Sequence, residues 1–127
     1  METSLNEKLH EAAYLGDTQK CSLLIKQGAN VNYKNCLDIT PLHAAASEGY
    51  AETTRFLLEQ GADPNAVSDE WVRNETPLHS AARYGQEECC RILVQYGADK
   101  TLKDWDGFTP QELAWFKGHD ITWLCPT

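Results

Sequence analysis

Histidines recur at a regular spacing in this chain. His43 follows His10 by 33 residues and His79 follows His43 by 36, with His119 near the carboxyl end. Imidazole can bind a metal or carry protons in catalysis, but either role needs further ligands or a partner close by. No cysteine or carboxylate recurs beside these histidines at ligand spacing. We therefore expect structural histidines, with no catalytic residue, no metal site and no cofactor.

Cysteine is the other residue type that could carry chemistry here. The chain has five cysteines, and their spacing matches no metal-ligand pattern. An odd number of them indicates reduced thiols and therefore a cytoplasmic or nuclear protein. They are Cys21, Cys36, Cys89, Cys90 and Cys125. The first, third and fourth fall at apolar positions of predicted helices, where we expect buried thiols that act as small hydrophobic groups.

The charge balance narrows the classes of partner. Nineteen acidic and eleven basic residues give a formal net charge of −8, which argues against a nucleic-acid-binding surface. No apolar run approaches the ~20 residues of a membrane span, and the polar amino terminus does not read as a signal peptide. The length predicts one domain over residues 1–127. The sequence has no Gly-rich phosphate loop, and no paired-carboxylate pocket can be placed on it. The sequence thus predicts neither an enzyme nor a protein that binds membranes or nucleic acids.

The histidines belong to a repeated phrase that defines the elements around them. Thr-Pro-Leu-His begins at Thr40 and again at Thr76, and weaker echoes begin at Glu7 and Thr109. Two sets of glycines keep the same spacing: Gly16, Gly49, Gly85 and Gly118, and then Gly28, Gly61 and Gly97. A period near 33 with this phrase predicts stacked helical units, and four of them exceed the roughly three that such arrays need.

Each unit carries its own helix signals. Thr40 can cap a helix that begins at Pro41, where the missing N–H of proline has no cost. Gly49 ends this inner helix in a tight turn, and an outer helix is predicted from about Glu52 to Gln60. We expect Phe56, Leu57 and Leu58 to be buried on it, and helices Pro77–Tyr84 and Glu87–Tyr96 in the next unit. Two residues before each Thr stand Asp38, Asn74 and Gly107, types that tolerate a left-handed turn.

This pattern resembles the ankyrin-repeat family over essentially the whole chain. The resemblance implies an all-α solenoid of stacked helix-turn-helix units joined by β-hairpin loops, with units of about 5–37, 38–73, 74–106 and 107–127, the last truncated. It implies that the repeated histidines bond the backbone of the adjacent hairpin. It also implies that partners bind the concave face, which hairpin tips and inner helices form.

Both ends depart from the family pattern. The first unit lacks a hairpin and has Glu7-Lys8 in place of Thr-Pro, as a solvent-facing cap should. The fourth has Gln111-Glu112 in place of Leu-His, and its second helix is predicted only over 121–125, before Pro126. We expect its packing to rest on Ile121, Trp123 and Leu124. That end is either a minimal cap or the place where a longer protein was cut.

A longer second hairpin is the first candidate for specificity. Three extra residues lie between Asn65 and Thr76, and the hairpin carries Trp71, Val72 and Arg73. Insertions in solenoids gather on one face, often the binding face. The alternative is that Trp71 folds back onto its own loop.

A stripe of variable surface positions is the second candidate. Hairpin tips and the last turns of inner helices carry aromatic, apolar and basic residues, which are enriched in interfaces. With the hairpin residues Trp71 and Arg73, the predicted protein-binding residues are Tyr14, Leu37, Ile39, Arg83, Tyr84, Trp105, Phe108 and Phe116. Neighbouring hairpins could instead cover Ile39, Phe108 or Phe116. Lys34, Arg73, Arg83, Lys103 and Lys117 also fall near this side, so we expect a concave face that is less acidic than the rest.

These features predict a monomeric module that binds another protein, as an adaptor or as an occluding inhibitor. The alternative is a target-recognition segment of a larger protein, such as a ubiquitin-ligase receptor. A weaker hypothesis concerns modification. Asn32 and Asn65 imperfectly match the hairpin asparagine that is hydroxylated in some ankyrin repeats, although each side chain can simply bond hairpin backbone.

Overall fold

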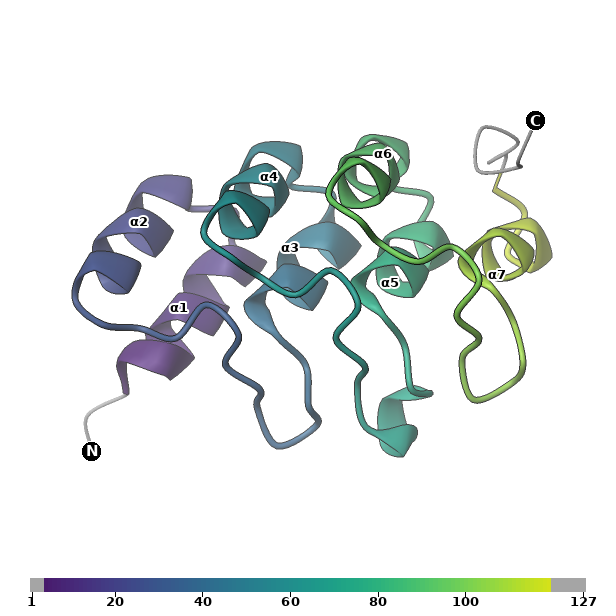
Figure 1. The fold of residues 1–127 in the computed structure, drawn as a ribbon, viewed down its shortest axis with the longest axis horizontal. Helices are drawn as coiled ribbons and strands as arrows, with labels where there is room; N and C mark the ends of the chain where they lie inside the picture. Colours follow the sequence, from purple (N-terminus) through teal and green to yellow (C-terminus); the bar gives the residue numbers. More distant parts are fainter. Residues whose placement is uncertain (1–3, 120–127) are drawn as a thin grey trace.

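Helices in two rows build the molecule (Figure 1). The computed structural model describes residues 4–119, so the predicted helix at 121–125 and its three packing residues lie outside it. The inner row consists of α1 (Leu5–Tyr14), α3 (Pro41–Glu48), α5 (Pro77–Arg83) and α7 (Pro110–Phe116). The outer row consists of α2 (Thr18–Lys26), α4 (Ala51–Glu59) and α6 (Glu87–Gln95). The predicted all-α stack is confirmed, and the predicted ends of α4, α5 and α6 are within one residue.

Three loops extend from the inner row on one side (Figure 1). They are loop 1 (27–40), loop 2 (60–76) and loop 3 (96–109). A backbone hydrogen bond closes the tip of each: Asn35 N–H to the Ile39 carbonyl, Ser68 to Glu75, and Asp104 to Phe108, at 3.1, 2.9 and 2.9 Å. The loops reverse as hairpins do, but no residue between 4 and 119 is assigned to a strand. Loop 2 instead contains a single 3₁₀ turn, Glu70–Val72, which the sequence did not reveal.

Threonine caps fix where the inner helices start. Thr40 Oγ1 accepts a hydrogen bond from the His43 N–H at 3.2 Å, and Pro41 occupies the first helical position. Thr76 and Thr109 repeat this arrangement. These contacts satisfy N–H groups that a helix otherwise leaves unpaired. The predicted capping role is confirmed in all three units.

The first helix begins earlier than the repeat implies. By register, Glu7 corresponds to Thr40, yet α1 starts at Leu5. Ser4 is its cap, and its Oγ accepts from the Glu7 N–H at 3.1 Å. Ser followed by Glu three residues later is the capping-box pattern, so this start was readable in the sequence.

Inner and outer helices meet in an apolar core. Leu9, Leu42 and Leu78 are fully buried at equivalent places of three inner helices, and Leu57 and Leu93 are fully buried on outer helices. The small residues between them let the helices approach closely. Contrary to expectation, Phe56 is only half-buried because it lies at the edge of this core. None of the helices between residues 4 and 119 has the length and apolar character needed to cross a membrane.

The helical cysteines belong to this core, as predicted. Cys21 and Cys90 are fully buried, and Cys89 is almost so. Burial raises the pKa of the Cys21 thiol to about 11 and that of Cys90 to about 12. Thiols with such pKa values stay protonated at neutral pH and are poor nucleophiles.

Asparagine side chains tie consecutive units together. Asn32 accepts from the Asp63 N–H at 2.7 Å and donates to the Gly61 carbonyl at 3.1 Å. Asn65 repeats both contacts one unit further on, with the backbone of Asp99 and Gly97 at 2.7 and 3.3 Å. Each amide therefore satisfies one donor and one acceptor of the next unit. This is the structural role expected for both residues, while their hydroxylation stays a prediction.

One row of side chains on each inner helix points toward the next unit, and we call it the forward face. On α3 it consists of His43, Ala46 and Gly49, which are three residues apart. His43 reaches the Glu75 carbonyl of loop 2, and Ala46 is fully buried. Gly49 has a φ of +82°, and a Cβ there would lie 2.6 Å from the Gln86 side chain. Close stacking thus requires small residues at the second and third places.

The forward face of α7 breaks this pattern. Ala13 of α1 and Ala82 of α5 occupy the central place and are buried, whereas α7 has Trp115 there, 80 % exposed. Glu112, in place of His, turns back onto its own helix and accepts from the Thr109 N–H at 3.0 Å. α7 therefore lacks the small, buried residue that the earlier inner helices have on the face toward the next unit.

Candidate protein-binding site

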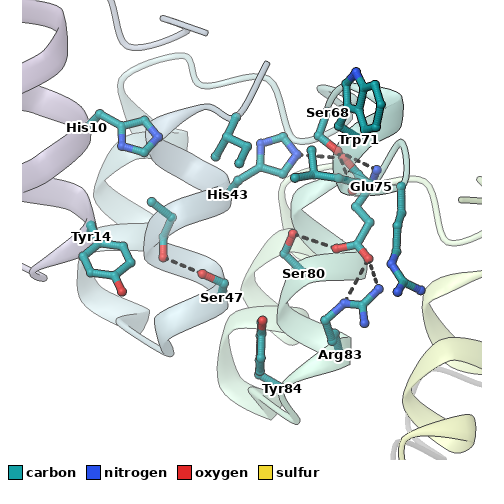
Figure 2. A pocket seen from close by; sticks show the side chains of 14 residues that line it. His10, Tyr14, His43, Ser47, Ser68, Trp71, Glu75, Ser80, Arg83 and Tyr84 are labelled. Atoms are coloured by element: carbon teal, nitrogen blue, oxygen red, sulfur yellow. Dashed lines mark hydrogen bonds and ion pairs between the residues drawn. The ribbon is translucent and has the colours of Figure 1, made fainter. Parts of the chain in front are cut away.

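A hollow of about 430 Å³ opens between the inner helices and loop 2 (Figure 2). Side chains from α1, α3, α5 and loops 1 and 2 line it, so three units contribute. The lining residues are His10, Tyr14, Ile39, His43, Ala44, Ser47, Ser68, Trp71, Val72, Arg73, Glu75, Ser80, Arg83 and Tyr84. Its size lies in the range of ligand-binding clefts.

The structure brings together six of the ten predicted binding residues. They are Tyr14, Ile39, Trp71, Arg73, Arg83 and Tyr84. Leu37, Trp105, Phe108 and Phe116 do not line the hollow within the described part of the chain. The ten positions therefore divide into two groups, one around the hollow and one that lies mostly on loop 3 and α7.

Three exposed aromatic side chains surround the hollow. Tyr14 is 51 % exposed, Tyr84 59 % and Trp71 83 %. Trp71 therefore does not fold back onto its own loop. The three rings come from different places: Tyr14 is on α1, Tyr84 directly follows α5, and Trp71 is on loop 2, as Figure 2 shows.

Hydrogen bonds of loop 2 hold the backbone at Trp71. Asp69 accepts from the Trp71 N–H at 2.8 Å, and its own N–H donates to the Leu37 carbonyl of loop 1 at 2.9 Å. Arg73 and Asn74 adopt left-handed φ values of +69° and +49°, which are uncommon away from glycine. The Asn74 amide donates to the Ser68 carbonyl at 3.0 Å, which closes the loop behind the 3₁₀ turn. The loop that exposes Trp71 is thus itself held in place by hydrogen bonds.

A buried carboxylate forms the floor of the hollow, and the sequence reasoning missed it. Glu75 is only 7 % exposed, and its Oε2 accepts from both Nε and Nη2 of Arg83, the Nε contact at 3.0 Å. Its position is taken by Ile39 and Phe108 in neighbouring units. An acid where the repeat places apolar residues was the available signal, and Arg83 eight residues later was its partner.

That the concave face is less acidic than the rest stays a prediction, but two of its expected cations are paired with acids. Arg83 is committed to Glu75, and its side chain is only 15 % exposed. Arg73 pairs with Asp106 of loop 3 at 3.1 Å. Two of the five cations expected near the concave face are therefore neutralised by acids of the same face. These pairs could not be predicted from sequence position, because each arginine binds an acid that lies on a different element: Arg83 binds Glu75 of loop 2, and Arg73 binds Asp106 of loop 3.

The repeated histidines are structural in the two central units. His43 Nε2 donates to the Glu75 carbonyl and His79 Nε2 to that of Phe108, at 2.8 Å each. In this tautomer, Nδ1 of His43 accepts from the Thr40 N–H at 3.2 Å. Burial lowers the pKa of His43 to about 4 and also lowers that of His79, so both rings are neutral at pH 7.

The other two histidines differ from this pattern. His10 borders the hollow, and its Nε2 has no partner at full hydrogen-bond distance within the described residues. Burial lowers its pKa, and an interaction with the Ile39 backbone offsets part of that effect. His119, for which the sequence offered no role beyond a turn, bonds through Nε2 to the Arg83 carbonyl at 3.0 Å. It thereby connects the turn after α7 to the end of α5.

A second aromatic group lies beyond the hollow. Phe108 stacks on Phe116, with ring centroids 5.4 Å apart, and the Lys117 ammonium lies 5.9 Å from the Phe116 ring. The Trp105 side chain is 63 % exposed, and the backbone N–H of Trp105 donates to the Arg73 carbonyl at 2.7 Å. Phe116 is 66 % exposed, and Phe108 is only half-buried, so loops do not fully cover either. Between residues 4 and 119 no cluster of three or more metal-ligating side chains accompanies these groups.

Comparison with known proteins decides the family. A family model described as three copies of the ankyrin repeat matches residues 9–104 and again residues 64–124. The chain is an ankyrin-repeat protein. The family is a protein-binding module and is typically non-catalytic. This ankyrin-repeat protein therefore carries its hollow on a scaffold whose known use is to bind other proteins.

Several curated relatives match about half of this ankyrin-repeat chain. Human protein phosphatase 1 regulatory subunit 27 is 40 % identical over 62 residues, which cover 49 % of this chain and 40 % of that protein. Human ankyrin repeat and KH domain-containing protein 1 is 46 % identical over 66 residues, 52 % of this chain and 3 % of that protein. Human Rabankyrin-5 is 42 % identical over 62 residues, 49 % and 5 % respectively. The matched region spans less than half the length of each of these relatives.

Proposed function

We propose that this protein binds another protein on its concave face, with part of the partner seated in the hollow. The observation that carries this proposal is the convergence of three exposed aromatic rings, from α1, loop 2 and α5, around one hollow. Exposed aromatics that surround a polar floor are typical of the centre of an interface. Because loop 2 is already ordered by its own hydrogen bonds, little conformational entropy is lost when a partner binds.

The module acts as an adaptor or as an inhibitor that occludes its partner. Among its relatives is a protein named as a regulatory subunit of protein phosphatase 1. That phosphatase is therefore the first purified partner to test. We further propose that the chain works as a monomer, and that it is located in the cytoplasm or nucleus, because its cysteine pattern is typical of reduced thiols.

Affinity capture with matched variants tests the proposal. The bait is the full chain, and the comparison baits are Trp71→Ala, Tyr84→Ala and, as a control on the outer helix α4, Glu59→Ala. A partner of the concave face should be retained by wild type and the control and lost with both aromatic variants. Purified partner is then titrated to give a Kd for each bait. Equal retention by all four baits would place the binding face elsewhere.

A second candidate is a target-recognition segment within a larger protein. The observation that favours it is that matched repeats form only 3 % of one relative and 5 % of another. The length of the native gene product distinguishes the two candidates. In the second case the concave face would bind the same target, but its effect on that target would require the remaining domains.

A further inference from the structure

The two oxygens of Glu75 are unequally satisfied. Oε2 takes both guanidinium contacts from Arg83, whereas within residues 4–119 Oε1 receives only the Ser80 hydroxyl at 3.5 Å, the limit for a hydrogen bond. A carboxylate oxygen can accept about two hydrogen bonds, and a buried one that lacks them is costly. Figure 2 shows this carboxylate between Ser80 and Arg83, at the hollow that it lines. Oε1 of Glu75 can therefore accept a further hydrogen bond.

Three acids without an ion pair in the described residues lie next to lining residues in the sequence or at an equivalent position of the repeat. Glu48 follows the lining residue Ser47, Glu70 precedes Trp71, and Glu11 occupies on α1 the place of Ser80 on α5. All three are exposed, and none makes an ion pair within residues 4–119. Both arginines of the lining are already paired. The chain as a whole carries a net charge of −8, so its overall field attracts cations.

An anionic group would fit this hollow poorly. Glu75 neutralises Arg83 and Asp106 neutralises Arg73, so a partner carboxylate would meet cations that are already paired, and the buried carboxylate of Glu75 would repel it. A cation has no such conflict, because it can approach the free side of Glu75 while Arg83 stays in place. The rings of Tyr84 and Trp71 add faces on which a guanidinium can stack.

We propose that the hollow recognises an arginine on a basic segment of the partner, which deepens the proposed function and rests on it. The guanidinium donates to Glu75 Oε1 and stacks against the aromatic side chains. Flanking basic residues of the same segment face Glu48 and Glu70. Arginine is preferred over lysine because its planar group can stack and donate at the same time.

Matched synthetic peptides test this proposal. Three fluorescein-labelled peptides of equal length, in a Gly-Ser background, carry Arg-Leu-Arg, Lys-Leu-Lys or Glu-Leu-Glu at the centre. Fluorescence polarisation with the full chain should show the arginine peptide binding at least about tenfold tighter than the glutamate peptide. The lysine peptide should lie between them. Equal binding of the arginine and glutamate peptides would overturn the proposal.

Variants locate the binding. Glu75→Gln and Tyr84→Ala should each weaken the arginine peptide by roughly fivefold or more, while Glu59→Gln, which removes one acid from α4, should not. Because Glu75→Gln leaves Arg83 unpaired, the double variant Glu75→Gln with Arg83→Gln removes the pair without a stranded charge. It should bind as weakly as the single variant, with thermal melting to confirm folding. Equal losses in Glu59→Gln and Glu75→Gln would mean attraction by net charge alone and would refute an arginine site.

The same variants separate this inference from the proposed function. If a captured partner loses affinity with Trp71→Ala but not with Glu75→Gln, the concave face binds proteins and the arginine site is wrong. If neither variant affects any partner, both proposals fail.

Discussion

Some side chains of one unit make hydrogen bonds to the backbone of the next unit. His43 begins on α3, yet its Nε2 bonds a carbonyl of loop 2. Glu75 offers that carbonyl and places its carboxylate under the hollow. One residue thus joins the stacking of two units to the floor of the candidate site. Substitutions at this place should therefore affect stability and binding together, unlike changes at the exposed aromatic rings.

Removal of the His43 imidazole tests the structural role. His43→Ala leaves the buried Glu75 carbonyl without its donor, so the free energy of unfolding should fall by about 1–3 kcal/mol. Urea denaturation at pH 7 measures the loss, with Glu59→Ala as a surface control. Zinc or a chelator should leave the Tm unchanged. A large shift on chelation would contradict the structural assignment.

The low pKa of His43 also predicts how stability depends on pH. Burial lowers this pKa from 6.5 to about 4 in the folded protein, so between these values the unfolded chain binds more protons. Stability from this residue should be intact above pH 6.5 and be lost as pH falls toward 4, by roughly 3 kcal/mol in all. Urea denaturation at pH 7, 5.5 and 4.5 measures the slope. His43→Gln should flatten it, and an unchanged slope would mean that another group is responsible.

For Trp71 we predict the opposite of His43: a change in binding with little change in stability. Its side chain is 83 % exposed, so Trp71→Ala should barely change the Tm. If it anchors a partner, the change should cost about 2 kcal/mol of binding, or roughly thirtyfold in Kd. Calorimetry and a melting curve on the same preparation give both numbers. Unfolding with unchanged affinity in the folded fraction would show that the ring is part of the core.

At the scale of helices and turns, the sequence carried most of the information. Thr-Pro starts and glycine turns are short-range signals, and they placed α3 to α6 within one residue. Asp38, Asn74 and Gly107 all adopt the left-handed φ that their residue types suggested. The pairing of Glu75 with Arg83 was not predictable in the same way, because it joins the end of a loop to the last turn of a helix. Four of the six predicted residues that line the hollow were found from register positions, and Trp71 and Arg73 were found from the longer hairpin.

The turn after α3 offers a matched test of stacking. Gly49→Ala adds a Cβ at a φ of +82° and 2.6 Å from Gln86, so it combines backbone strain with a clash. Gly107 has a nearly equal φ of +83° and nothing within 4 Å. Strain alone costs about 1–2 kcal/mol, so Gly49→Ala should exceed Gly107→Ala. Denaturation of both variants checks this, and equal losses would show that the neighbouring turn simply moves aside.

The whole molecule is a sum of units and of the contacts between them. The paired asparagine bonds, the histidine bonds and the forward faces all act between neighbours, and none spans more than one unit. A partner seated in the hollow, however, would touch α1, α3, α5 and loop 2 at once. Binding there would therefore stabilise three units together and slow their separate opening.

The forward face of α7 has a consequence for how copies of the chain meet. Stacked units have two unlike faces, so a molecule that displayed an intact forward face could receive the first unit of another copy. Such a head-to-tail contact does not close, and it grows into a filament. Trp115 occupies the register position of the buried residues Ala46 and Ala82, and its exposed, bulky ring would oppose such an approach. If this one bulky side chain prevents open-ended polymerisation, Trp115→Ala should show larger species in sedimentation velocity as concentration rises, whereas Tyr84→Ala should not.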